Sequence, residues 1–188
     1  QLVRRFRFGD FDNTERSPHG AAVITDGKQH IFLNPSTNKF NPAYKPITLG
    51  GFIHPTAEDG VIAAQGGEAM GYTMRLKDGR IQFSVRAHGQ LFTAVGPAIK
   101  LNAWTHVLAV LDRNAKLGFY VDGKRIKTEV KAAFLPSAPA DGFTLGLDGG
   151  SLVDDYGAAN GLQGKMADFR LYWGVLEPAD LESWIQPK

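Results

Sequence analysis

The chain has no cysteine among its 188 residues. A disulfide framework and a zinc site built on thiolates are therefore both excluded. The absence leaves the redox compartment open, because bacterial secreted proteins often lack cysteine. Apolar runs of transmembrane length are missing as well, so we expect no membrane-spanning segment. Since the sequence begins at Gln1, we expect a mature or trimmed chain, which is compatible with the earlier removal of a signal peptide.

Charge of one sign is also scarce. The chain carries 21 Lys and Arg against 19 Asp and Glu, which gives a formal net charge of +2. Proteins that hold nucleic acid by its phosphates have a much stronger positive balance. We therefore expect neither a nucleic-acid partner nor a membrane partner, and any cationic patch has to be local.

Several catalytic and cofactor motifs are absent. The 5 histidines are scattered without the spacing of a metal-binding motif such as H-E-x-x-H. No G-x-S-x-G turn supports a nucleophilic serine. The glycine pairs at 66–67 and 149–150 lack the lysine and the helix of a phosphate-binding loop. The residues thus offer no nucleophile, nucleotide site or transition-metal site, and we expect no cofactor.

Turn residues and apolar side chains, by contrast, are plentiful. The 22 Gly and 10 Pro punctuate many short runs of strand-like sequence, as expected for an all-β protein. Hydrophobic residues make up 43% of the chain, including 12 Phe and 3 Trp, which is enough for a substantial core. Nothing near the middle resembles a linker. We predict a single domain over residues 1–188, an antiparallel two-sheet sandwich that ends in a short helix at 178–184.

Residues 104–124 predict a β-hairpin. The run at 105–111 is apolar at nearly every position, which is typical of a strand covered on both faces. In the second run Leu117, Phe119 and Val121 alternate with other residues, so we expect them to point into the core. The Asp122-Gly123 turn ends this run.

A second hairpin, at 71–77 and 81–87, sorts its side chains onto two faces. We expect the apolar set to point inward: Met74, Leu76, Ile81, Phe83 and Val85. The polar set should then share the outer face: Arg75, Lys77, Gln82, Ser84, Arg86 and His88. Such a cationic face is suited to carboxylate or sulfate groups. The alternative is an ordinary solvated sheet face, where Arg and Lys are common.

A loop at 148–161 carries three aspartates, four glycines and Tyr156. Two roles fit this tyrosine, either stacking on a sugar ring or anchoring the loop to the core. The loop is followed by a strand at 165–173 and then by the C-terminal helix.

Two segments carry a family resemblance. They are WTHVLAVLDRNAKLGFYVDGKRI at 104–126 and GLQGKMADFRLYWGVLEPADLESW at 161–184, the second preceded by LGLDGGSLVDDYG. Both resemble laminin G-like domains, which implies the concanavalin A-like jelly roll and core roles for Trp104, Trp173 and Trp184. The LGLDGGSLVDDYG segment is also similar to modules appended to secreted bacterial sulfatases and other glycan-active enzymes. Fold alone does not determine function.

The resemblance also raises the question of calcium. Members of this superfamily often hold a structural calcium with an aspartate of the last strand, and Ala167 stands at that position, with Asp168 beside it. Calcium needs six or more oxygen ligands, so we do not expect the usual site. Loop acids offer alternatives, Asp10 with Asp12 and Asn13, or Asp154 with Asp155, although clustered loop acids are more often turn formers.

Catalysis is not expected from the resemblance either. Glycosidases of this fold carry paired acids on an E-x-D-x-x-E strand, and this chain has none. The lyases of this fold carry Gln-Ile-His on a strand, whereas residues 29–31 read Gln-His-Ile.

We therefore predict a non-catalytic carbohydrate-binding module, accessory to a secreted glycan-active enzyme and located outside a bacterial cell or on its surface. The predicted ligand is a polysaccharide or oligosaccharide, preferably anionic, bound by a monomer through Arg75, Lys77, Arg86, His88 and Tyr156. The alternative is a structural or protein-interaction module that positions an adjacent catalytic domain. Its expected signature is an apolar surface patch, for which Phe40, Tyr44 and Phe52 are the candidates. A hydrolase or lyase ranks last.

Overall fold

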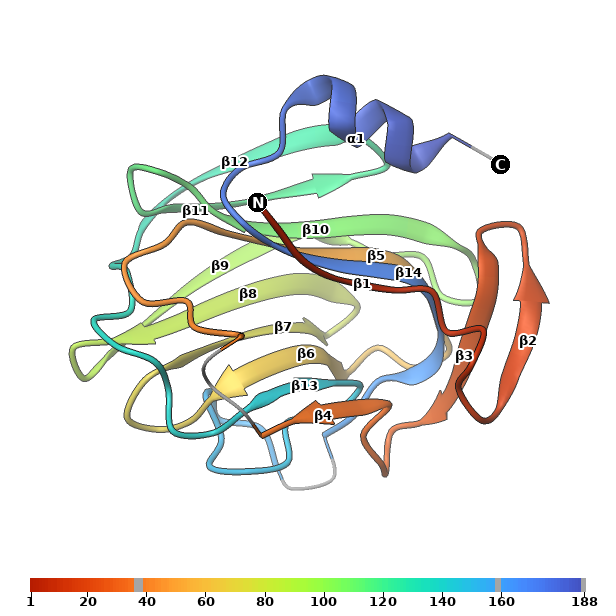
Figure 1. Ribbon diagram of the computed structural model, residues 1–188, viewed down its shortest axis with the longest axis horizontal. Helices are drawn as coiled ribbons and strands as arrows, with labels where there is room; N and C mark the ends of the chain where they lie inside the picture. The colour runs from red at the N-terminus through yellow and green to blue at the C-terminus, as the bar shows by residue number, and fades with distance from the viewer. Residues whose placement is uncertain (36–38, 158–159, 187–188) are drawn as a thin grey trace.

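Two antiparallel sheets pack face to face in the structure, a computed structural model that describes residues 1–35, 39–157 and 160–186. Over these residues the larger sheet has eight strands in the order β12-β11-β10-β5-β14-β3-β2, and β1 also pairs with β14. Figure 1 shows it in the upper half of the molecule. Its strands are β1 (Leu2–Phe6), β2 (Thr14–Ser17), β3 (Gly20–Asp26), β5 (Ile47–Pro55), β10 (Thr105–Leu111), β11 (Lys116–Val121), β12 (Lys124–Lys131) and β14 (Gln163–Trp173).

The smaller sheet has six strands in the described part of the chain, in the order β4-β13-β6-β7-β8-β9. They are β4 (Phe32–Asn34), β6 (Gly60–Gly66), β7 (Gly71–Lys77), β8 (Arg80–Ala87), β9 (Gln90–Ala98) and β13 (Phe143–Leu145). One helix follows, α1 (Pro178–Ile185), with Pro178 in its first turn. The architecture confirms the predicted all-β antiparallel jelly-roll sandwich with a short C-terminal helix. No helix of the described residues is long and apolar enough to cross a membrane.

The inner faces of the sheets form the main core. Strands β7 and β8 pair as predicted, with Met74 opposite Phe83 and Leu76 opposite Ile81. All the side chains expected to point inward from this hairpin are at most 1% exposed, and they pack with Phe119 from the opposite sheet. The period-two alternation of the sequence therefore located one half of the core correctly.

Strand β10 is buried on both faces, as its apolar run predicts. Val107, Ala109 and Leu111 point into the main core, whereas Leu108 points to the outer face of the larger sheet. There α1 covers a second apolar cluster. Its buried members are Ala22, Phe52, Leu108, Ala167, Leu176, Leu181 and Trp184.

The tryptophans differ in burial. Trp184 is 2% exposed in the second cluster, but Trp104 and Trp173 are half-buried and pack at the margins of the two clusters. The core role inferred from the family resemblance therefore describes Trp184 better than the other two.

The apolar patch expected around residues 34–46 does not form on the surface. Phe40 is 1% exposed in the main core and Phe52 is 5% exposed beneath α1, so only Tyr44, at 72%, lies in solvent. Phe40, in a turn before β5, stacks on Phe143 of the smaller sheet with 5.3 Å between ring centroids, and Phe52 of β5 packs in the cluster under α1. Residues 36–38 of this segment lie outside the described residues.

Phe119 tests the packing of the two sheets. Phe119→Ala should lower the free energy of unfolding by about 3–5 kcal/mol, because it leaves a cavity between them. Tyr44→Ala, which removes an exposed ring, should change it by less than about 0.5 kcal/mol. Urea unfolding followed by tryptophan fluorescence measures both. Similar losses for the two variants would contradict the assigned core.

Candidate functional site

The outer face of the smaller sheet is covered by a loop. The loop follows β13, passes β6 and β7, and is bound to β8 at two points. Ser84 Oγ donates to Asp154 Oδ2 at 2.7 Å, and Arg86 Nε donates to the carbonyl oxygen of Val153 at 2.8 Å. We call its described part, residues 148–157, the covering loop; Figure 1 draws it in light blue at the lower edge. The polar face that the sequence places in solvent is therefore largely enclosed.

Arg75 is the main correction to the predicted cationic surface. Its side chain does point outward from β7, but the covering loop leaves the residue only 7% exposed. Its Nη2 lies 3.6 Å from Asp154 Oδ2 and 3.5 Å from Asp155 Oδ1. The guanidinium also lies 5.1 Å from the ring centroid of Tyr156. The positive charge of Arg75 is thus compensated within the protein.

Asp154 is the carboxylate that meets this buried cation. Burial by itself would raise its pKa, but hydrogen bonds from Ser84 and the backbone N–H of Asp155, together with the charge of Arg75, hold the pKa below its usual value. Asp154 therefore stays ionised opposite Arg75. Ser84 also shares a hydrogen bond with Thr93 of β9, at 2.9 Å. The contacts of Asp154 thus reach β7, β8 and, through Ser84, β9.

Tyr156 anchors the covering loop to itself. Its hydroxyl donates to Asp148 Oδ2, and the backbone N–H of Val153 donates to the same oxygen at 3.1 Å. Burial raises the pKa of Asp148, and burial together with the charge of Asp148 raises the pKa of Tyr156 well above its ordinary value. Asn160 closes the loop, donating to the carbonyl oxygens of Asp148 at 3.1 Å and Gly157 at 2.7 Å. These contacts fix the shape of the loop from within.

The covering loop packs closely against the backbone of Gly67 and Gly71. A Cβ at Gly71 would lie 2.9 Å from Val153 Cγ2, and one at Gly67 would lie 2.4 Å from Ser151 Oγ. Ser151 Oγ in turn accepts a hydrogen bond from the backbone N–H of Glu68 at 3.0 Å. The glycines of the β6–β7 turn are thus needed for packing against the loop.

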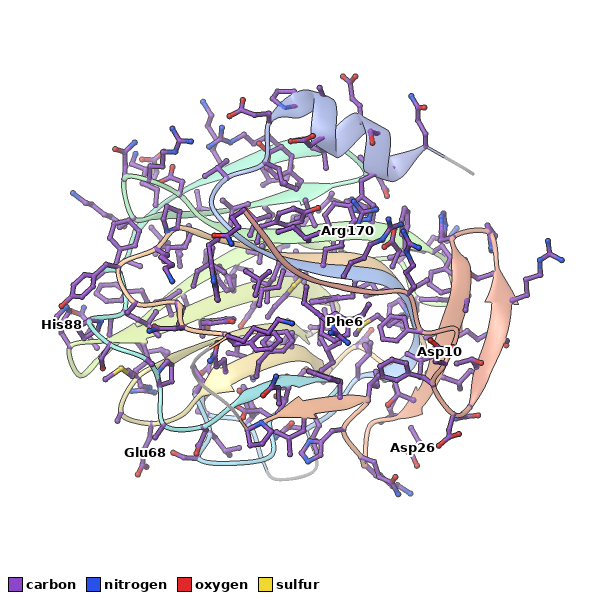
Figure 2. The ribbon with its side chains drawn as sticks, viewed as in Figure 1. Phe6, Asp10, Asp26, Glu68, His88 and Arg170 are labelled. Atoms are coloured by element: carbon purple, nitrogen blue, oxygen red, sulfur yellow. The ribbon has the colours of Figure 1, made fainter. Side chains whose placement is uncertain are left out.

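A hollow of about 520 Å³ remains beside the covering loop. We call it the loop hollow. Arg86, Glu68 and Asp155 bring charged groups to it, and Ser151 and Leu152 complete its wall. Figure 2 shows the labelled Glu68 side chain at the lower rim of the molecule. The walls of the loop hollow present both hydrogen-bond donors and acceptors to solvent.

The five predicted ligand-binding residues do not form one cluster. Arg75 and Tyr156 contact each other, and Arg86 holds the covering loop and lines the loop hollow. Lys77 pairs with Arg80 beside the turn between β7 and β8, whereas His88 follows the far end of β8 and is exposed. Figure 2 shows His88 at the left-hand edge, well away from Glu68.

Sequence reasoning missed that Asp148, Asp154 and Ser84 organise this face. The acids were visible as a loop cluster, but nothing local indicates that Asp154 lies against a strand 70 residues earlier. The available signal was the outward position of Arg75 and Ser84, two groups that need partners once they are covered.

The residues considered as calcium ligands on the last strand and in the covering loop make other contacts in the structure. Ala167 is buried in the cluster under α1, and both oxygens of Asp168 accept hydrogen bonds from Arg5 and Arg170. The loop acids Asp154 and Asp155 face Arg75. No group of three or more His, Cys, Asp or Glu residues in the described ranges has the arrangement of a metal site.

Comparison with known proteins identifies the family. Residues 25–182 match the model of the concanavalin A-like lectin/glucanases superfamily. The chain belongs to this superfamily. No curated protein sequence matches it.

Solved structures of the same fold are distant in sequence. The binding domain of Paraclostridial Mosquitocidal Protein 1 has a TM-score of 0.71 at 11% identity over 97% of this chain, and the chain spans only 47% of that one. Domain 4 of AbnA, a GH43 extracellular arabinanase from Geobacillus stearothermophilus in complex with arabinotriose, has a TM-score of 0.70 at 16% identity, covering 99% of this chain and 98% of the other.

A third structure is the CBM40 of the Ruminococcus gnavus IT-sialidase bound to α2,3 sialyllactose. It has a TM-score of 0.65 at 14% identity and covers 99% of this chain and 100% of its own. At these identities the likenesses establish the fold.

Asp154 provides a test of the covering loop. Asp154→Ala removes the buried partner of Arg75, leaves it only the exposed carboxylate of Asp155, and should lower the free energy of unfolding by about 3 kcal/mol at pH 7. Asp155→Ala is the matched control, since its side chain is 82% exposed and such pairs contribute less than about 1 kcal/mol.

The loss should also depend on pH. The pKa of Asp154 is lower in the folded protein than in the unfolded chain, where it is about 3.9. Its contribution is therefore complete above that value and declines as the pH falls through the folded pKa. Urea unfolding at pH 7, 5 and 3 measures the difference between wild type and Asp154→Ala. A difference that grows toward pH 3 would contradict this role.

Proposed function

We propose that the chain is a non-catalytic carbohydrate-binding module and that the loop hollow is its sugar site. The observation that carries the proposal is that the hollow is preformed. The hydrogen bonds of Asp154, Val153 and Asp148 fix the covering loop before any ligand arrives. A rigid wall reduces the ordering cost of binding, which matters for a sugar held mainly by exposed hydrogen bonds.

The charges at the loop hollow favour a neutral sugar. Arg86 is a cation there, but Glu68, Asp154 and Asp155 are also present, and Arg75 is already paired with the last two. An anionic polysaccharide would meet more negative than positive charge, because three carboxylates face the two guanidinium groups. Carboxylates accept hydrogen bonds from sugar hydroxyls and a guanidinium donates to them, so this mixture fits an uncharged oligosaccharide better than the anionic ligand expected from the sequence.

The role as an accessory module is part of the proposal. Two structures of the same fold are a domain of an extracellular arabinanase in complex with arabinotriose and a sialidase module bound to sialyllactose. They support an oligosaccharide ligand and a place beside a catalytic domain in a larger secreted bacterial enzyme. The chain's lack of the paired acids of a glycosidase supports a binding role without hydrolysis. The apolar surface patch expected for a protein-interaction module is not supported, because Phe40 and Phe52 are buried.

Binding to a panel of neutral oligosaccharides tests this site. Asp155→Ala should weaken the binding of the best ligand at least tenfold, about 1.4 kcal/mol, while leaving stability nearly unchanged. Arg86→Ala should also weaken binding at least tenfold, and it removes the hydrogen bond to Val153 as well. Isothermal titration calorimetry measures both.

Lys77→Ala and His88→Ala are the matched controls, since these residues lie at opposite ends of the β7–β8 hairpin. Their affinities should equal that of wild type. Unchanged affinity in Asp155→Ala and Arg86→Ala together, or new reducing ends released from the panel, would reject the proposal.

A further inference from the structure

The outer face of the larger sheet carries a second and larger hollow, of about 740 Å³. It lies between the end of β1, the β2–β3 hairpin and the C-terminal end of α1, elements that Figure 1 shows together at the upper right. We call it the arginine hollow. Its volume falls within the range of small-molecule sites, about 300–1,000 Å³. The residues that matter below are Arg5, Arg7, Arg16, His19, Asp168 and Trp184.

Asp168 lies at the base of the arginine hollow between two guanidinium groups. Arg5 donates to it through Nε at 2.6 Å and Nη2 at 2.8 Å, and Arg170 donates through Nε at 3.2 Å and Nη2 at 2.7 Å. Burial would raise the pKa of Asp168, but these hydrogen bonds and charges hold it below its usual value. One carboxylate therefore faces two cations, and Arg5 keeps its Nη1 group for another acceptor.

A β-bulge creates this arrangement. The pairing of β14 with β5 shifts register between Ala167 and Arg170, and Asp168 has a left-handed backbone with φ of 41°. Met166 and Phe169 belong to the main core, whereas Ala167 packs under α1 on the outer face. The extra residue lets Asp168 join the outer face while Phe169 returns to the core. Bulges and left-handed non-glycine residues are over-represented at functional sites.

The rim adds cations without partners. Arg7 and Arg16 are exposed, and neither forms an ion pair with any residue that the structure describes. Glu15, the other acid lining the hollow, is bound by Lys165 at 2.6 Å. Among the described residues around the arginine hollow, two carboxylates (Glu15 and Asp168) thus meet five cations, which are Arg5, Arg7, Arg16, Lys165 and Arg170.

Flat side chains form part of the wall. His19 stacks on Phe52 with 3.7 Å between ring centroids, and burial lowers its pKa, so the imidazole is neutral at pH 7. The Arg170 guanidinium lies 4.1 Å from the ring centroid of Trp184. Trp184 lines the hollow at 2% exposure, and its indole Nε1–H has no hydrogen-bond partner. Hydroxyl groups of Thr14 and Ser17 complete the surroundings.

We propose that the arginine hollow is a second binding site, specific for an oligosaccharide that carries a carboxylate or sulfate group. Guanidinium groups recognise such oxyanions by paired, charge-assisted hydrogen bonds. The half-buried imidazole of His19 and the exposed hydroxyl of Thr14 beside them suit the rest of a sugar ring better than they suit a bare ion. The site is separate from the loop hollow because the two lie on the outer faces of different sheets.

The test uses the full chain labelled with ¹⁵N and four probes at constant ionic strength. These are trigalacturonate, the neutral galactotriose, a sulfated disaccharide and inorganic sulfate. Trigalacturonate or the sulfated disaccharide should bind, shift the Trp184 indole Nε1–H signal, and lose affinity as salt is added. Galactotriose should leave that signal unmoved, and inorganic sulfate should bind at least tenfold more weakly than the acidic sugar.

The variant is Arg7→Ala with Arg16→Ala, since both side chains are exposed and unpaired. It should weaken binding of the acidic sugar at least tenfold. Its matched control is Lys124→Ala with Lys131→Ala, which removes the same charge from exposed positions on β12 and should leave the affinity unchanged. Asp155→Ala, at the loop hollow, should also leave it unchanged.

Three results would overturn the proposal. Equal binding of galactotriose and trigalacturonate would show that charge is not recognised. Inorganic sulfate that binds as tightly as the acidic sugar would show a general anion site. Acidic-sugar binding lost in Asp155→Ala but kept in the Arg7/Arg16 variant would place the ligand at the loop hollow. Failure of neutral sugars to bind at the loop hollow would contradict only the sugar site proposed there. The two sites are therefore tested separately.

Discussion

Burial of one apolar face from each sheet is the interaction on which the rest of the structure depends. It holds the sandwich together, but it leaves each sheet with an outer face that must be polar or covered. The covering loop encloses the smaller sheet through Asp154 and Val153, and α1 encloses the larger one through Leu181 and Trp184. Each cover is incomplete, and a hollow lies at its margin. Both candidate sites therefore follow from how the outer faces are closed.

The inner faces could be predicted because side-chain direction in a strand is a local property. Alternation alone placed Met74 and Phe83 in the core, and the Asp-Gly turns set which strands pair. What covers an outer face is not local. Ser84 and Asp154 are 70 residues apart, and no periodicity in either segment indicates that they meet. The fold was therefore readable from the sequence, whereas the burial of Arg75 was not.

The same limit explains why the charge of Arg75 was expected to be available to a ligand. Sorting Arg75 and Arg86 onto one face counts the cations but omits the carboxylates that a distant loop brings to them. Exposed cations at the arginine hollow are instead Arg7, directly after β1, and Arg16 of β2. Charge compensation is a tertiary property. Faces predicted from strands can therefore locate a charged residue without showing whether its charge is available to a ligand.

Asp168 shows how one local irregularity links fold and function. In a regular strand the position between Ala167 and Phe169 would point inward, and an unpaired carboxylate in the main core would cost several kcal/mol. The bulge instead accepts a left-handed aspartate, a strain of about 1–3 kcal/mol. In return the carboxylate reaches Arg5, 163 residues away, and ties β1 to β14. That ion pair holds Arg5 at the base of the arginine hollow. The bulge that keeps the Asp168 carboxylate out of the main core therefore also positions the Arg5 guanidinium beside the hollow.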